Sequence, residues 1–183
     1  AGEDIRCLNN IASPVQTIRD TLMLMPHDTP EQLDALRSRL SKVPASLNGY
    51  KDSLIEAASR GMVAPQRQIS DVFVQSERLA DAGSMLEDLG LDADSAEVTK
   101  AKQAFGEFAD WLSNELQPKA PSQDAVGRER YERFSKLFVG DAVDLDEAYD
   151  WGLDQVRSIK AEQEKIARQL YGADGQSSPC LLY

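Results

Sequence analysis

Histidine and cysteine are nearly missing from this sequence of 183 residues, which has one His and two Cys. A zinc site usually combines several His or Cys ligands at short spacings, whereas His27 stands alone. Cys7 and Cys180 lie near opposite ends, and two isolated thiols favour a reducing compartment over a disulfide framework. A catalytic pair of His27 with a cysteine is the remaining alternative, because spacing does not decide which side chains meet. We predict no catalytic residue and no metal ligand in this chain, and a cytoplasmic location.

Long apolar runs and a basic charge balance are also missing. No stretch approaches the roughly 18 apolar residues that indicate a membrane span, and the start does not have a signal-peptide pattern. The formal net charge of −11 repels the phosphates of nucleic acids and of anionic membranes. We therefore expect neither nucleic acid nor membrane as a partner. Because the sequence begins at Ala1 rather than Met, we also expect it to be a piece of a longer protein.

Loops for phosphate or calcium are missing as well. The acidic run from Asp141 to Asp154 does not fit a calcium loop with its central Gly, so capping and solvation of a helix start is the simpler interpretation. Gly152 lies inside a predicted helix, where it costs about 1 kcal/mol relative to Ala. A close helix crossing would explain it, and room for a ligand is the alternative. Tyr149 and Gly152 are the residues for which we predict a substrate contact.

Helix signals, by contrast, recur along the whole chain. Ser13 and Thr29 are each followed by Pro and, three positions on, by Gln, a pattern that predicts capped helices from Pro14 and from Pro30. The second helix carries an apolar stripe of four residues and is predicted to end at Pro44; the stripe is Leu33, Leu36, Leu40 and Val43.

Two further helices are predicted next, one over about 45–60 and one that begins at Pro65, followed by a short helix and a turn in 83–94. After these, one helix is predicted from a cap at Asp94 to Pro118 and another over 128–139. Aromatic residues at helical spacing are predicted to be core residues rather than a cofactor site; they are Phe105, Phe108, Trp111, Phe134 and Phe138.

The last predicted helix, capped by Asp144 and ended by Gly172, is the most regular. Its inner positions follow an unbroken spacing of four and three residues, which is typical of coiled-coil-like packing. The row comprises Leu145, Tyr149, Gly152, Val156, Ile159, Gln163, Ile166 and Leu170.

The fold class predicted from these signals is all-α. About seven helices with short connections favour an antiparallel bundle with a long C-terminal helix. We expect one domain over 1–172 with a hinge near 118–127, and a loop-like, poorly ordered tail over 173–183.

Two segments carry a family resemblance. The first runs from Asp4 through the stretch Leu-Asn-Asn-Ile-Ala-Ser-Pro-Val-Gln at 8–16 to Glu31. The second begins with Ala-Val-Gly-Arg-Glu-Arg-Tyr at 125–131 and continues with Asp-Leu-Asp-Glu-Ala-Tyr-Asp-Trp-Gly at 144–152. In order and spacing they resemble the N-terminal half of a bacterial family of unknown function, family 885, with actinobacterial members most similar.

That resemblance implies a long, mostly helical protein similar to zinc metallopeptidases. The presumed metal motif of such proteins, His-Glu-x-x-Pro-Gly-His, and a downstream Glu-Gly-Trp lie in the C-terminal half, and this sequence contains neither. The pattern also stops matching after Gly172. Zinc and a hydrolase or peptidase activity are therefore expected of the full-length protein, with none of its catalytic residues in this chain.

Two hypotheses follow. In the first, the chain is the N-terminal helical region of such a protein: it forms part of a substrate-channel wall, packs against the missing C-terminal half and contacts a peptide substrate. In the second, it is a stand-alone helical interaction module, and the row of inner positions on the last helix forms a homodimer.

Overall fold

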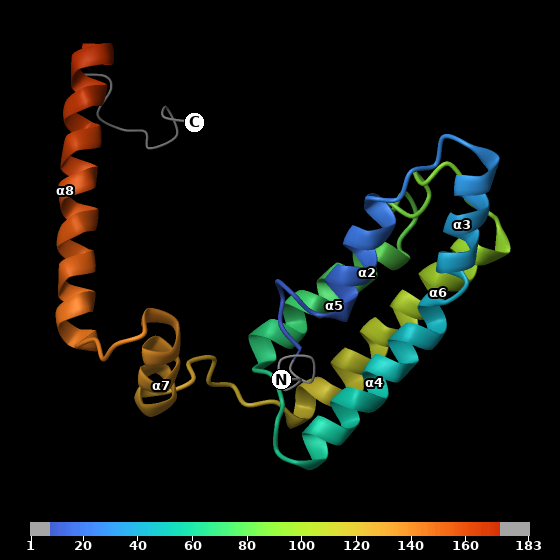
Figure 1. Cartoon of the computed structure of the whole chain (residues 1–183), viewed down its shortest axis with the longest axis horizontal. Coiled ribbons are helices and arrows are strands. Elements are labelled where there is room, and N and C mark those ends of the chain that lie inside the picture. The colour runs from blue at the N-terminus through green and yellow to red at the C-terminus, as the bar shows by residue number, and fades with distance from the viewer. Residues whose placement is uncertain (1–7, 173–183) are drawn as a thin grey trace. The chain divides into compact units, whose positions relative to one another are not determined.

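The computed structural model describes residues 8–172, which form helices and no strand. This confirms the all-α prediction. The chain divides into two compact units, Ala1–Ala125 and Val126–Tyr183, and each is described by itself (Figure 1). The border between them falls inside the segment 118–127, where we predicted a hinge. The single domain over 1–172 and the antiparallel arrangement of seven helices stay predictions, and the predicted tail over 173–183 lies outside the described residues.

The helices of the first unit occupy most of residues 14–119. They are α2 (Pro14–Met23), α3 (Pro30–Leu40), α4 (Val43–Ser59), α5 (Gln66–Ala80) and α6 (Ala96–Trp111), which continues into a π-helix, η1 (Leu112–Leu116), and a 3-10 turn, η2 (Gln117–Lys119).

α6 is the central helix of the first unit, because α3, α4 and α5 all contact it. An apolar stripe along this helix is buried over its whole length and into η1; it consists of Val98, Ala101, Phe105, Phe108, Leu112 and Leu116. Burial of such side chains contributes about 1.5–3 kcal/mol each for the larger ones, so this stripe stabilises the unit.

The neighbours of α6 run in different directions (Figure 1). The Gln66 amide at the start of α5 donates to the carbonyl of Pro121 beyond η2, at 3.0 Å, so α5 and α6 are antiparallel. α4 and α6 are parallel, since Tyr50 stacks on Phe108 and, one residue further along α4, the Lys51 ammonium lies over the Trp111 ring. α4, α5 and α6 follow one another in up-down-up order, so the first and the third of them, α4 and α6, point the same way.

Both predicted capping boxes are present. The Thr29 hydroxyl accepts from the Gln32 amide, and the Gln32 side chain in turn accepts from the Thr29 amide. The predicted end of this helix at Pro44 was wrong. α3 ends at Leu40, and Val43 and Pro44 begin α4 instead. A proline in the first turn of a helix lacks only an amide that has no intrahelical acceptor, so proline starts helices as readily as it ends them.

The segment 83–94 contains turns rather than the short helix we predicted. Leu86 and Leu89 are nevertheless buried, so the loop closes one end of the core. Gly90 has a φ of +77°, and a Cβ at this position would lie 3.1 Å from Cδ2 of His27. The single histidine thus packs against a glycine backbone.

The second unit consists of α7 (Arg128–Val139) and α8 (Leu145–Tyr171), and the described ends of both agree with prediction. The Asp144 carboxylate caps α8 by accepting from the amides of Asp146 and Glu147. Within this described segment, neither helix has a buried residue.

The prediction that Phe134 and Phe138 are core residues was therefore wrong, with exposed fractions of 45% and 84%. Helical spacing predicts which residues share a face, but burial requires a second surface. Phe105 and Phe108, which lie in the first unit, are buried as predicted, and Trp111 is partly buried beside them.

Candidate functional site

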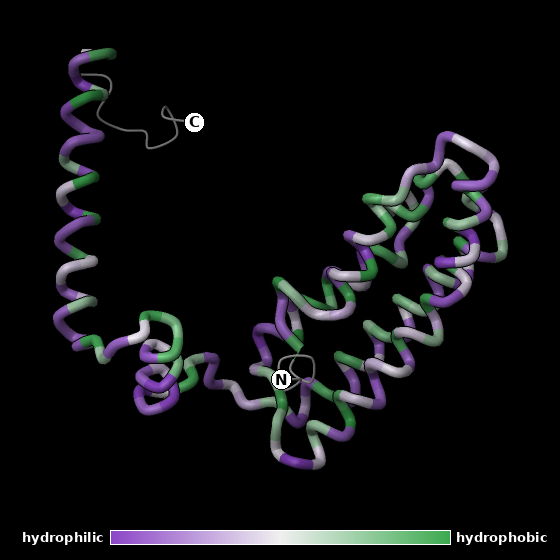
Figure 2. The backbone as a smooth tube through the Cα atoms, viewed as in Figure 1, coloured by the Kyte–Doolittle hydropathy of each residue, from purple (hydrophilic) through white to green (hydrophobic). Residues whose placement is uncertain are grey.

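The row of inner positions predicted for the last helix, from Leu145 to Leu170, lies on α8, and we call it the α8 seam. The large apolar side chains of this helix are exposed. Tyr149, Val156 and Leu170 each leave about two thirds of their surface uncovered, with exposed fractions of 67%, 63% and 66%. Trp151 lies outside the seam and is equally exposed. Apolar and polar residues alternate along the helix in the pattern that Figure 2 shows. Soluble monomeric proteins rarely leave many large apolar side chains uncovered on one helix. Such exposure is typical of interaction sites.

α7 presents a second exposed apolar face. Tyr131, Phe134 and Phe138 follow at three- and four-residue steps, and Leu137 extends the row. The Arg130 guanidinium lies 5.6 Å from the centre of the Phe134 ring, a cation–π contact that covers only part of it. We call the exposed apolar side chains of both helices the α7–α8 apolar surface.

One ion pair joins the starts of these two helices. Arg128 donates two hydrogen bonds to the Asp146 carboxylate, at 3.0 and 2.9 Å, and a third to Glu132. The hydrogen bonds and charge of Arg128 lower the pKa of Asp146, and the two carboxylates raise the pKa of Arg128. Sequence reasoning missed this pair. Its members lie 18 residues apart, and only the turn at 140–144 brings them together.

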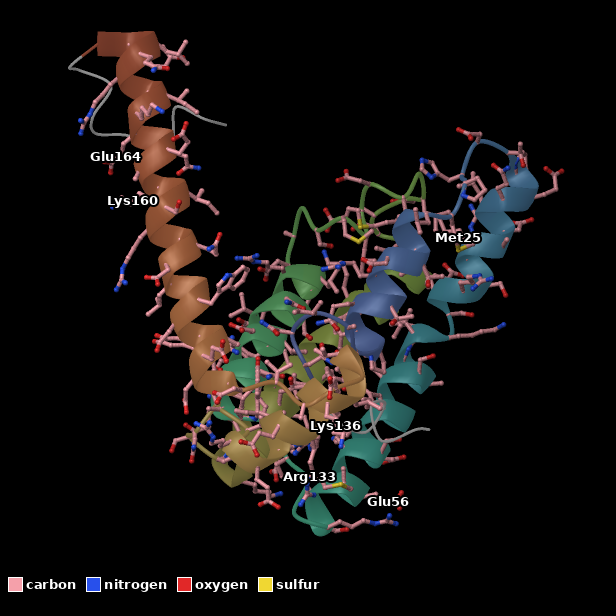
Figure 3. All side chains as sticks on the ribbon, turned by 60° about the vertical axis from the view of Figure 1, so that its left-hand side comes forward. Met25, Glu56, Arg133, Lys136, Lys160 and Glu164 are labelled. Carbon is pink, nitrogen blue, oxygen red and sulfur yellow. The ribbon has the colours of Figure 1, made fainter. Side chains whose placement is uncertain are left out.

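Charged side chains flank the apolar rows. Figure 3 shows Arg133 and Lys136 on α7 and Lys160 and Glu164 on α8. Arg133 forms an ion pair with Glu129 one turn before it on α7. Glu132 pairs with Arg128. In the acidic run, Asp144 acts as the predicted cap.

Tyr149 and Gly152, the predicted substrate contacts, are three residues apart on α8. A Cβ added to Gly152 would meet no atom within 4 Å, so no helix of the described residues crosses α8 at this glycine. The predicted crossing is thus not found for Gly152. It is found for Gly106 on α6, where an added Cβ would lie 3.6 Å from the Cβ of Ala80 on α5. The substrate contact stays a prediction.

His27 lies in the first unit with its Nδ1 3.4 Å from the carbonyl of Met25. Among residues 8–172, no group of three or more His, Cys, Asp or Glu side chains is placed to hold a metal ion. Cys7 and Cys180 lie outside the described residues, so their pairing with His27 stays untested.

Residues of the first segment that carries the family resemblance form a polar network with α5. Asn10 donates to the Asp71 carboxylate at 2.8 Å, and the Gln75 side chain donates to the Asn10 carbonyl at 3.0 Å. Gln16, only 2% exposed, closes the network by donating to the Gln75 side chain. Buried polar groups need such partners. These residues of the segment therefore hold the start of α2 against α5.

Comparisons with known proteins agree with these segments. No helix in the described part of the chain is both long and apolar enough to cross a membrane. A comparison with curated proteins finds no match. Residues 1–179 match the family described as "Bacterial protein of unknown function (DUF885)". Since the match covers nearly the whole sequence and both resembling segments, the chain belongs to this DUF885 family.

Proposed function

We propose that this chain is the helical, non-catalytic region of a zinc-metallopeptidase-like protein of the bacterial cytoplasm, and that its α7–α8 apolar surface packs against the polypeptide that carries the chemistry. The observation that carries the proposal is the exposure of that surface: two amphipathic helices, no buried residue on either, and large apolar side chains uncovered on both. The hydrophobic effect favours covering this surface with other protein.

The sequence resemblance supplies the nature of the partner. The proteins that the resemblance implies carry their presumed zinc motif, His-Glu-x-x-Pro-Gly-His, in the C-terminal half. This motif does not occur in the present sequence. In the complete protein, α8 would form part of the wall of a substrate channel, with Tyr149 and Gly152 close to a peptide. Gly152 suits that position because nothing within 4 Å fills the space beside it.

The first test is genetic. Sequencing the parent gene beyond codon 183 is expected to reveal the His-Glu-x-x-Pro-Gly-His motif in frame. A stop codon directly after Tyr183 would contradict the proposal.

The second test uses Trp151, which is 65% exposed and projects from α8. In a Trp111→Phe background, Trp151 is the only tryptophan of this chain. Because the longer protein would add at least the tryptophan of its Glu-Gly-Trp segment, the Trp151 signal is taken in both proteins as the difference from a Trp151→Phe variant. This signal should be strongly quenched by acrylamide in this chain and protected in the longer protein. Equal quenching in both proteins would show that the partner does not cover α8.

Self-association is the second candidate function, and the α8 seam is the observation that favours it. Its four-and-three spacing is the pattern by which two helices pack knobs into holes. Light scattering on the purified chain should then show a dimer that Val156→Glu with Ile159→Glu converts to a monomer. Arg157→Glu, on the charged side, is the matched control. A strict monomer at every concentration would exclude this candidate.

A further inference from the structure

α2, α3 and the start of α4 enclose an open groove of about 550 Å³ in the first unit. This volume lies within the range of about 300–1,000 Å³ that is typical of small-molecule sites. The side chains of Leu22 and Val43 are buried in the groove, and Ile18 is partly buried beside them. The groove therefore has an apolar base that can hold the hydrocarbon part of a ligand.

Hydroxyl groups line the same groove from three helices. Thr21 belongs to α2, Ser38 to α3 and Ser46 to α4. Within residues 8–172, none of these three hydroxyls donates or accepts a hydrogen bond through its side chain. They are available to a ligand oxygen.

Two cations complete the lining. Arg39 and Lys42 both face the groove, and neither forms an ion pair with any described residue. On α2 and α3, Asp20 is paired with Arg19 at 2.7 Å and Asp34 with Arg37 at 2.8 Å. Glu31 lies in the first turn of α3, about 12 Å along the helix axis from Arg39. In a chain with a net charge of −11, two adjacent cations without a carboxylate partner form a local positive site.

We propose that this groove binds a small organic anion, with its carboxylate or phosphate held by Arg39, Lys42 and the hydroxyls and its apolar body on Ile18, Leu22 and Val43. Arg and Lys form the strongest hydrogen bonds of proteins with such oxygens. The site lies in the first unit, so it is independent of what covers the α7–α8 apolar surface.

The test titrates the full chain with four probes while amide NMR spectra report on Ile18, Ser38 and Val43. Hexanoate and hexyl phosphate carry both parts of the ligand and distinguish the two kinds of head group. Inorganic phosphate carries the head group alone, and hexylammonium has the same body with the opposite charge. We expect the tighter of the two hexyl anions to bind more strongly than inorganic phosphate, and hexylammonium not to shift these amides.

Variants assign the binding to the groove. Arg39→Gln and Lys42→Gln should each weaken binding of the hexyl anion by roughly fivefold, since each removes one charge-assisted contact at an exposed site. Arg37→Gln is the matched control, because it removes an equal charge from α3 but does not line the groove. All three residues are exposed, and dispersed amide spectra of each variant confirm that it folds.

Three results would overturn the proposal. One is the absence of saturable shifts at these amides with any anion up to 10 mM, roughly the weak limit for a specific site. Another is equal binding of hexylammonium. The third is an equal loss of affinity in Arg37→Gln, which would show that general charge rather than the groove attracts the anion.

Discussion

Gly90 has a backbone conformation that few other residues adopt, and it lies against His27. Its φ is +77°, and an added Cβ would come within 3.1 Å of the imidazole. Gly90→Ala should therefore lower the free energy of unfolding by about 1–3 kcal/mol, measured by urea denaturation. Gly83→Ala is the control for the backbone alone, since Gly83 has a φ of +72° but open space around it. Equal losses in both variants would contradict a role for the contact.

The contact with His27 can be tested separately. His27→Ala should recover part of the loss in the Gly90→Ala background, because it removes the ring that the new methyl group meets. Strictly additive effects would show that the two residues do not interact. Recovery would establish His27 as a packing residue, whereas its isolation in the sequence only disfavoured a metal site.

Gly106 should respond in the opposite direction. It lies inside α6, and an added Cβ would meet the Cβ of Ala80 at 3.6 Å, an ordinary van der Waals contact. Gly106→Ala should thus raise the free energy of unfolding by up to about 1 kcal/mol through helix propensity. Gly49→Ala, at an exposed position of α4, has nothing within 4 Å and measures propensity alone. A loss of stability confined to Gly106→Ala would mean that α5 and α6 cannot separate by even a few tenths of an ångström.

At the scale of elements, helix starts were the best predicted features. The boxes at Ser13 and Thr29 depend on residues three positions apart, so the sequence contains all that determines them. The start of α4 was missed because Pro44 fits a helix end and a helix start equally well.

Burial of α7 and α8 could not be predicted from periodicity. Phe105 and Phe108 are buried, whereas Phe134 and Phe138, which also follow one another at helical spacing, are exposed. A stripe indicates that a helix has an apolar face, but not where its partner lies. For the same reason the α8 seam, which was predicted as a row of inner positions, is exposed, and the sequence left open what it contacts.

The Arg128–Asp146 pair gives the start of α8 a pH dependence. Hydrogen bonds from Arg128, and then its charge, lower the pKa of Asp146 below its ordinary value of 3.8. A lowered folded-state pKa means that the stabilisation is present above pH 3.8 and is lost as the pH falls through the folded-state pKa. Carboxyl NMR titration of Asp146 should show this, and Arg128→Gln should raise the pKa towards 3.8.

The matched control for that titration is Arg133→Gln. It removes the pair with Glu129 on the same helix but leaves Asp146 untouched. An Asp146 pKa that is the same in Arg128→Gln and in the native chain would contradict the assignment.

At the scale of the whole molecule, the two units differ in what stabilises them. The first unit contains the buried core, which is built around α6. Its last residues contact α5 through an ion pair of Asp124 with Arg67 and a hydrogen bond from the Gln66 backbone amide to the Pro121 carbonyl. The second contains two helices without a buried residue among those described. Most helix stability in proteins comes from packing of an apolar face, and an isolated helix as short as the 12 residues of α7 is marginal in water. In this chain the second unit therefore depends on capping and on local ion pairs such as Arg128–Asp146.

A chain ending at Ala125 should therefore unfold cooperatively at the same temperature as the first unit does in the full chain. Trp111, partly buried against Phe108, reports this transition by near-ultraviolet circular dichroism in a Trp151→Phe background. The far-ultraviolet signal of the full chain should contain an additional broad, non-cooperative loss of helix from α7 and α8. If truncation instead abolishes the Trp111 transition, then residues 126–172 complete the core, and the single domain predicted for 1–172 describes the protein better than two units do. The same truncation separates the two proposals, because binding of a hexyl anion by the groove should survive it whereas every property of the α8 seam is removed.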